Sequence, residues 1–114
     1  MKSKSITVFK PWGRYEIIDK KPRFWIKKLF INQGERLSLQ SHQYRDEYWL
    51  VLDGKIKAIN GPDQLILSPG EQLKVNKGVK HRIVGLTNAC VVEIALGLVK
   101  ETDIIRYQDE YGRK

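Results

Sequence analysis

Residues 34–54 read Gly-Glu-Arg-Leu-Ser-Leu-Gln-Ser-His-Gln-Tyr-Arg-Asp-Glu-Tyr-Trp-Leu-Val-Leu-Asp-Gly. Gln40 and His42 stand two positions apart, so on a strand both side chains point to the same face. Glu47 follows a polar bend and opens an apolar run that ends at the turn dipeptide Asp53-Gly54. A hairpin of this kind brings together a carbonyl oxygen, an imidazole nitrogen and a carboxylate oxygen. These are borderline ligands that suit zinc or a similar divalent ion.

A fourth ligand is expected from His81, because the chain has 2 histidines and His42 is the other. His81 lies in residues 70–85, where an alternating strand runs into the turn Asn76-Lys77-Gly78 and a new strand follows. Both histidines could instead be structural, and Glu47 could serve only as an ion-pair partner of Arg45 or Arg36. The chain's two histidines both fall at positions where a metal ligand is expected, and this favours the metal site over a structural role.

The hydrophobic pattern predicts many short strands separated by turns that contain glycine or proline, which is typical of an antiparallel barrel or jelly roll. A helical period is suggested only near the end, where residues 101–107 could form a turn or two of helix capped by Thr102 or Asp103. The expected strands cover residues 6–9, 24–32, 36–42, 47–52, 56–60, 64–67, 73–76, 81–86 and 90–98.

Composition is that of one ordinary globular domain: 114 residues, of which 41% are hydrophobic and 30% charged. No apolar run approaches the ~20 residues of a membrane helix, and the N-terminus lacks the apolar core of a signal peptide. The single cysteine, Cys90, is expected to be a small core residue. One cysteine cannot form an internal disulfide, so we expect a cytoplasmic protein without membrane association.

The net charge of +8 is unevenly distributed, because residues 1–45 hold 11 Lys and Arg against 3 Asp and Glu, whereas residues 46–114 hold 10 of each kind. Such a bias can attract an anion, and either a phosphorylated small molecule or a nucleic acid fits. A solvated positive surface is the plainer interpretation. Nucleic acid is the weaker prediction, because only the charge supports it.

Residues 34–54 and 70–85 resemble the two motifs of the cupin superfamily, with Gln40 in place of the usual first histidine. Asn76 and Gly85 replace the usual proline and asparagine of the second motif. The resemblance extends to type II phosphomannose isomerase, the domain that usually forms the C-terminal part of bifunctional mannose-1-phosphate guanylyltransferases. It includes residues 11–15, Pro-Trp-Gly-Arg-Tyr, and a C-terminal motif at 101–113. It implies a single cupin domain over residues 1–114, an all-β double-stranded β-helix or jelly-roll barrel with a short C-terminal helical segment.

This resemblance also implies a chemistry, the interconversion of mannose 6-phosphate and fructose 6-phosphate with the help of one divalent metal ion. Zinc is the first choice, with Mn, Co, Ni or Fe as alternatives, and guanylyl transfer is not expected. Arg106 is the expected catalytic cation that faces the enediolate or the phosphate. The family often has a second histidine where this chain has Tyr48. The implied metal ligands are Gln40, His42, Glu47 and His81.

Several points stay open at this stage. The general base could be Lys27, Lys28, Asp103 or a metal-bound water. A homodimer is expected, since pairing would cover exposed strand edges. Two other functions compete with the isomerase, a sugar-phosphate-binding cupin without turnover and an Fe(II)-dependent cupin oxygenase. The expected contacts to the phosphorylated sugar are Lys28, Arg82 and Arg113, with Lys80 as a further candidate.

Overall fold

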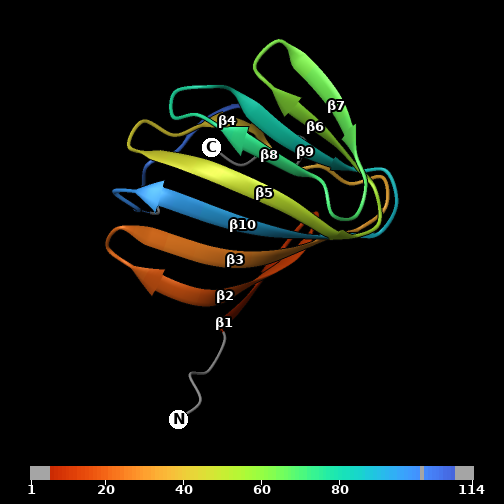
Figure 1. The fold of residues 1–114 in the computed structure, drawn as a ribbon, viewed down its shortest axis with the longest axis horizontal. Coiled ribbons are helices and arrows are strands. Elements are labelled where there is room, and N and C mark those ends of the chain that lie inside the picture. The colour runs from red at the N-terminus through yellow and green to blue at the C-terminus, as the bar shows by residue number, and fades with distance from the viewer. Residues whose placement is uncertain (1–5, 101, 110–114) are drawn as a thin grey trace.

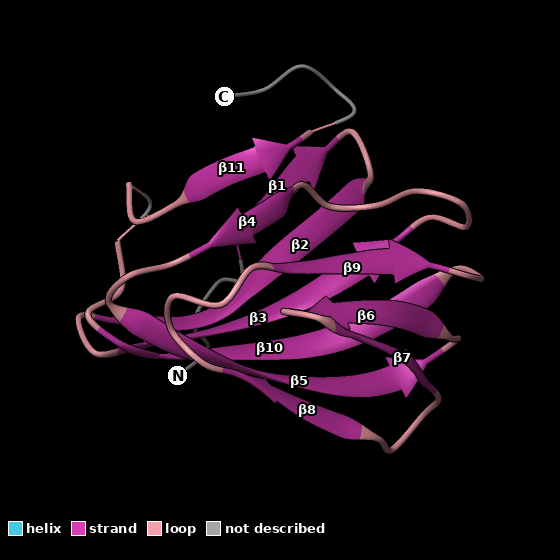
Figure 2. Ribbon diagram, turned by 90° about the horizontal axis from the view of Figure 1, so that it is seen from above, coloured by secondary structure: helices cyan, strands magenta, loops and turns pink. Residues whose placement is uncertain are grey.

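The computed structural model describes residues 6–100 and 102–109, and every regular element in that part of the chain is a strand. The strands form a six-stranded sheet of order β1-β2-β3-β10-β5-β8 and a five-stranded sheet of order β11-β4-β9-β6-β7. Figures 1 and 2 show them as two facing layers. The bounds are β1 Ile6–Lys10, β2 Gly13–Lys21, β3 Phe24–Ile31, β4 Leu39–Ser41, β5 Arg45–Asp53, β6 Ile56–Asn60, β7 Asp63–Leu67, β8 Gln72–Val75, β9 His81–Gly85, β10 Ala89–Gly97 and β11 Ile105–Gln108.

The expected all-β, two-layer architecture is confirmed, and period-two alternation explains why. In β3 every second side chain is buried, and the same alternation marks most of β5 and β10. β10 lies between β3 and β5 and pairs antiparallel with both, so these three strands line one wall of the interior. The buried apolar side chains of the two layers pack into one core that includes Trp12, Leu29, Trp49, Val51, Ile56, Ile83 and Val91.

The predicted C-terminal helix is wrong. Ile105–Gln108 form β11, which pairs antiparallel with β4 through Ile105↔Ser41 and Arg106↔Gln40. Residues 104–107 read Ile-Ile-Arg-Tyr, and β-branched and aromatic residues favour a strand. β4 offers an unpaired edge at this place, and its backbone hydrogen bonds outweigh a weak helical tendency. The rest of the expected segment, residues 101 and 110–113, lies outside the described residues.

The outer edge of β1 has no partner strand among the described residues, and β1 exposes Ile6 and Phe9 at 59% and 77%. An open apolar edge is the kind of surface that a second copy could cover, but the homodimer stays a prediction. No helix in the described ranges has the length and hydropathy needed to span a bilayer.

Gly54 closes the turn between β5 and β6 and shows why this position of the motif requires glycine. Its φ is +73°, a left-handed conformation, and a Cβ there would lie 2.1 Å from the carbonyl oxygen of Asn88. Gly70, at the turn before β8, has a φ of +90° but no atom within 4 Å of an added Cβ. A side chain at Gly70 would meet only the strain of the left-handed backbone, whereas a side chain at Gly54 would meet that strain and a steric clash as well.

We expect Gly70→Ala to lower the free energy of unfolding by roughly 1–2 kcal/mol, the cost of a left-handed alanine. Gly54→Ala should cost more than about 3 kcal/mol, because backbone must also move away from the new methyl group. Urea unfolding of both variants beside the native chain measures the difference. Equal losses would show that the contact with Asn88 does not constrain the turn.

Candidate metal centre

Three buried side chains from both sheets meet inside the fold. His42 follows the end of β4, Glu47 lies on β5 and His81 begins β9, and their ligand atoms all lie within 4.8 Å of one another. Each of the three is at most 3% exposed. Two imidazoles and a carboxylate, brought to one point from β5, β9 and the turn after β4 and shielded from water, are a donor set that fits a divalent metal ion.

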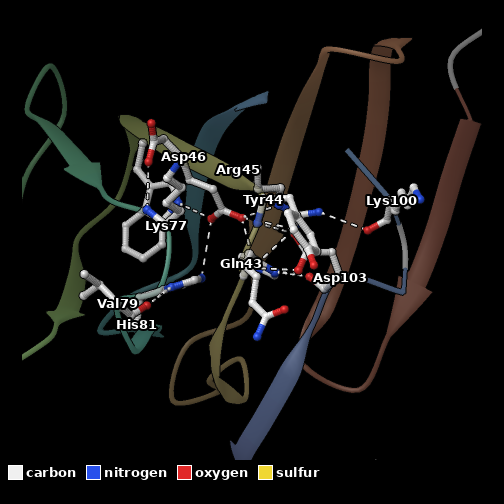
Figure 3. Close-up of polar contacts among 12 residues, drawn as sticks. Gln43, Tyr44, Arg45, Asp46, Lys77, Val79, His81, Lys100 and Asp103 are labelled. Atoms are coloured by element: carbon white, nitrogen blue, oxygen red, sulfur yellow. Dashed lines mark hydrogen bonds and ion pairs between the residues drawn. The ribbon is translucent and has the colours of Figure 1, made fainter. Parts of the chain in front are cut away.

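The orientation of both imidazole rings is set by backbone carbonyls. Nδ1 of His42 contacts the carbonyl oxygen of Asp103, and Nδ1 of His81 lies 3.0 Å from that of Val79, a contact visible in Figure 3. A carbonyl oxygen can only accept, so each Nδ1 carries the hydrogen and donates it. Each Nε2 is thereby left to face Glu47, which is the arrangement that metal-binding histidines commonly show.

Glu47 is the centre of this cluster, and both of its carboxylate oxygens are engaged. Oε2 accepts from Nε and Nη2 of Arg45, at 3.2 and 3.1 Å, and lies 3.0 Å from Nε2 of His42. Oε1 accepts from Nε1 of Trp49 at 3.1 Å and lies 3.6 Å from Nε2 of His81. Nη2 of Arg45 also lies 3.1 Å from Nε2 of His42, so the ring nitrogen that faces Glu47 contacts the same arginine.

The electrostatics keep Glu47 and His81 in the protonation states that a metal needs. Burial alone would raise the pKa of Glu47, but its hydrogen bond to His42 and the charges of His81, His42 and Arg45 hold that pKa well below its ordinary value. Burial lowers the pKa of His81, and the Glu47 carboxylate opposes this shift only in part. At neutral pH Glu47 is therefore ionised and His81 neutral, so neither must lose a proton to bind a cation.

Gln40 and Arg106 lie beside His81 in one row across the five-stranded sheet. Gln40 on β4 pairs with His81 on β9, and on its other side with Arg106 on β11. Both line the same cavity as the three ligand residues. Arg106 lies next to Gln40 because residues 105–108 form a strand that pairs with β4, and not the helix that the sequence predicted.

The cluster forms part of the wall of a cavity of about 100 Å³ between the two sheets. Five cationic side chains line it against two carboxylates, Glu47 and Glu93, among the described residues. Trp12, Trp25 and Trp49 line it as well and are buried core residues, as their size and polarity predict. The cationic side chains are Lys10, Lys27, Arg45, Arg82 and Arg106.

The residues expected to hold the sugar phosphate are not all in this wall. Arg82 lines the cavity, but its Nε donates to the carbonyl of Leu37 at 2.8 Å and its Nη2 to that of Gln108 at 3.1 Å. Lys28 is not among the lining residues, since it follows Lys27 on β3 and points to the other face. Arg113 lies outside the described residues. Lys80 is exposed, with Nζ 4.3 Å from the ring centre of Tyr107.

Three residues of the wall escaped the sequence analysis as site residues: Arg45, which was considered only as an ion-pair partner, Lys10 and Glu93. Glu93 is the most informative, because it occupies an inward position of β10 between Val91 and Ala95, both fully buried. A charged residue at an inward position of an apolar strand was the signal that could have found it.

Glu93 is itself titratable near neutral pH. Burial and, next, the Glu47 carboxylate raise the pKa of Glu93 from 4.5 to about 7, against the charges of Lys27, Arg45 and His42. Lys27 lies opposite Glu93 in the pairing of β3 with β10 and is buried too. Its Nζ lies 4.3 Å from the ring centre of Tyr15 and 4.1 Å from that of Trp25. Two aromatic faces thus hold this ammonium group in place.

Asp103 does not point to the cavity as a base would. Its two carboxylate oxygens accept the backbone N–H groups of Gln43 and Tyr44 at 2.8 and 3.0 Å, as Figure 3 shows. Its carbonyl oxygen accepts from His42. Lys100 adds a bond from the same segment, because its carbonyl accepts from Nη1 of Arg45 at 3.5 Å. The segment before β11 therefore holds the turn that carries His42 and Arg45.

Comparison with known proteins identifies relatives over nearly the whole chain. The family described as Mannose-6-phosphate isomerase C-terminal matches residues 1–109. The xanthan biosynthesis protein XanB of Xanthomonas campestris pv. campestris is 36% identical over 109 residues, 93% of this chain and 23% of that protein. The mannose-1-phosphate guanylyltransferase of Escherichia coli K12 is 33% identical over 109 residues, with the same two shares. The chain thus spans about a quarter of the length of these curated relatives.

Solved structures establish the cupin fold. An RmlC-like cupin from Shewanella frigidimarina superposes with a TM-score of 0.76 at 13% identity, covering 85% of this chain and 86% of that one. KdgF from Halomonas sp. gives a TM-score of 0.75 at 17% identity, covering 87% and 91%. Pac13, described as a nucleoside dehydratase, gives 0.80 at 12% identity and covers 98% of both chains. At these identities the likeness concerns the fold alone, and it confirms the expected cupin.

We expect Asp103→Ala to weaken metal binding by about tenfold, because the carboxylate that fixes the turn after His42, and so keeps the Asp103 carbonyl against the His42 ring, is lost. The measurement is a competition titration of the metal-free protein against a chromogenic chelator. Asp63→Ala, at the exposed start of β7, is the matched control and should leave affinity unchanged. Unchanged affinity for the metal in Asp103→Ala would mean that the turn after β4 keeps its shape without the Asp103 carboxylate.

The pKa of Glu93 predicts a change of stability with pH. Between pH 4.5 and about 7 the folded state keeps a proton that the unfolded carboxyl releases, so Glu93 lowers the free energy of unfolding as pH rises through this window. Glu93→Gln should therefore match the native chain near pH 4.5 and exceed it by on the order of 3 kcal/mol at pH 8.

Urea unfolding across this pH range, with a chelator present, measures the effect. Glu16→Gln is the control, since Glu16 follows the cavity residue Tyr15 on β2 and points to the other face. A difference between Glu93→Gln and the native chain that stays constant with pH would contradict the assignment.

Proposed function

Because the chain belongs to the mannose-6-phosphate isomerase C-terminal family, we propose that it interconverts mannose 6-phosphate and fructose 6-phosphate with one bound divalent metal ion. The observation that carries the proposal is the buried cluster of His42, Glu47 and His81 in the wall of a cavity rich in cations. Family membership suggests the reaction, and the cluster supplies the groups that the reaction requires.

The proposed metal ligands are Nε2 of His42, Nε2 of His81 and the Glu47 carboxylate, with the side-chain oxygen of Gln40 as the fourth. The Nδ1–H groups of both rings are donated to backbone carbonyls, which supports coordination through Nε2. A divalent ion held there would polarise the carbonyl and hydroxyl oxygens of the sugar during isomerisation. Zinc suits two imidazoles and a carboxylate best, and manganese, cobalt, nickel and iron are the other ions to test.

Positive charge would bind the phosphorylated substrate. Five cationic side chains in the cavity wall give a field that favours a dianionic phosphate and an enediolate oxygen. Arg106 is the proposed catalytic cation, because β11 places it one strand away from the ligands on the row that includes Gln40 and His81. Arg82 has two backbone carbonyl partners, so we assign it the support of the cavity wall beside β11.

The second candidate is a sugar-phosphate-binding cupin without turnover. The observation that favours it is the share of the relatives that this chain represents, 23% of proteins whose names refer to guanylyl transfer or xanthan biosynthesis. A domain within such proteins can bind a sugar phosphate without converting it.

A coupled assay for fructose 6-phosphate tests the proposal. The purified chain is stripped of metal, then assayed with mannose 6-phosphate and Zn, Mn, Co, Ni or Fe(II). We expect no turnover without metal and restored turnover with at least one ion. His81→Ala should lose both metal and activity, whereas Arg106→Ala should keep the metal and lose roughly 10²–10³-fold in kcat.

The result that would contradict the isomerase is absence of turnover with every ion while the metal and the sugar phosphate still bind. That result would favour the binding cupin instead. Asp63→Ala is again the matched control, because it removes an exposed carboxylate on β7, at the opposite edge of the five-stranded sheet from Arg106 on β11. Its activity should equal that of the native chain.

A further inference from the structure

Glu93 is a buried carboxyl group in the wall of the cavity. It occupies the middle of β10, faces the interior between Val91 and Ala95, and is only 8% exposed. Its strand neighbours are Lys27 on β3 and Trp49 on β5. All three side chains line the same cavity as the metal cluster. A charged group carried on the central strand of a rigid sheet is well placed to act repeatedly on a bound molecule.

Among the described residues that line the cavity, Glu93 is the one carboxylate outside the metal cluster. Glu47 is occupied by Arg45, Trp49 and the two histidines. Both histidines direct Nε2 toward Glu47, so neither offers a second basic nitrogen to the cavity. The tyrosine hydroxyl and the lysine and arginine groups of the wall are poor bases at neutral pH. Among the described residues of the cavity wall, Glu93 is therefore the remaining candidate for a general base.

The surroundings of Glu93 support both of its protonation states. The charged groups around it are Lys27 on β3, Glu47 and Arg45 on β5, and His42 after β4. Lys27 and Arg45 favour the carboxylate, whereas burial and Glu47 favour the acid, and the pKa of Glu93 accordingly lies at about 7. A group that must take up and release one proton in each turnover works best with this balance.

We infer that Glu93 is the catalytic acid–base group that moves the proton between the two carbons of the sugar, and that Lys27 is its positioning residue. The inference rests on the proposed isomerase function. It assigns a base that neither Lys27, Lys28 nor Asp103 supplies.

The step balances without any other reactant. The Glu93 carboxylate takes the proton from carbon 2 of the aldose, the C–H electron pair forms the C1–C2 double bond, and the carbonyl pair moves onto O1, which takes up a proton. Glu93 then returns its proton to carbon 1 as the double-bond pair moves to that carbon. The O2–H pair forms the new carbonyl at carbon 2, and the O2 proton replaces the one taken by O1. No electron is gained or lost overall.

The test compares Glu93→Gln, Glu93→Asp and the control Glu16→Gln, each loaded with the ion that supports the fastest native turnover. We expect Glu93→Gln to lose roughly 10²–10⁴-fold in kcat, with metal content and affinity for mannose 6-phosphate within about threefold of native. Glu93→Asp should recover part of that loss, and Glu16→Gln should be fully active. Exchange with solvent of deuterium at carbon 2 of the substrate, followed by NMR, should stop in Glu93→Gln.

The role of Lys27 is tested by pH. The native kcat/KM should fall on the acid side as the carboxylate of Glu93 becomes protonated, and Lys27→Met should move this limb to higher pH because a charge that favours the carboxylate is gone. A purely structural role for Lys27 would lower activity without moving the limb, and would overturn that assignment.

Two outcomes overturn the role of Glu93 while leaving the isomerase in place: a Glu93→Gln variant with more than about a third of native turnover, or one whose loss of activity follows loss of metal. A native chain that shows no turnover and no exchange overturns the isomerase, and this inference with it. The behaviour of the native chain therefore distinguishes the two failures.

Discussion

One buried carboxylate organises this protein. Glu47 is 2% exposed, and an ionised carboxylate inside a core is tolerated only when its oxygens are paired. Here the pairing involves Arg45 and Trp49 from its own strand and His42 and His81 from the opposite sheet. Two of these partners, the imidazoles of His42 and His81, are also the groups that could hold a metal ion together with Glu47. Removing any one of them would leave another charge or polar atom buried without its partner.

The C-terminal segment completes this arrangement. Residues 98–100 and 102–108 bind β4 and the turn after it through Asp103, Lys100 and the hydrogen bond between Ser41 and Tyr107 at 2.9 Å. They also add β11 to the five-stranded sheet. The segment thus acts at two places, at the ring of His42 and at the row that includes Gln40 and Arg106. Ligand geometry and cavity wall both depend on contacts across more than 55 residues of sequence.

The cavity combines two environments within one small volume. Arg45 pairs with Glu47 on β5, and on the neighbouring strand β10 Glu93 lies opposite Lys27 of β3. Burial acts oppositely on the two carboxylates. The pKa of Glu47 is held low by its partners, whereas that of Glu93 is raised to about 7 by burial and by Glu47. An ionised carboxylate in the candidate metal cluster and a carboxyl that can change protonation state are the pair that the proposed metal-assisted proton transfer would use.

The sequence alone predicted most of the strand pattern and singled out His42 and Glu47, because both depend on local spacing. Period-two alternation assigns Trp25, Lys27 and Leu29 to one face of their strand. The spacing of Gln40, His42 and Glu47 is likewise a local property that does not depend on how the rest of the chain folds. Only the tertiary structure decided which strands became neighbours. The insertion of β10 between β3 and β5 brings Glu93 to Lys27, and pairing with β4 turns residues 105–108 into a strand. Alternation gives the face of a side chain but not its partner, since partners come from long-range pairing that no local pattern encodes.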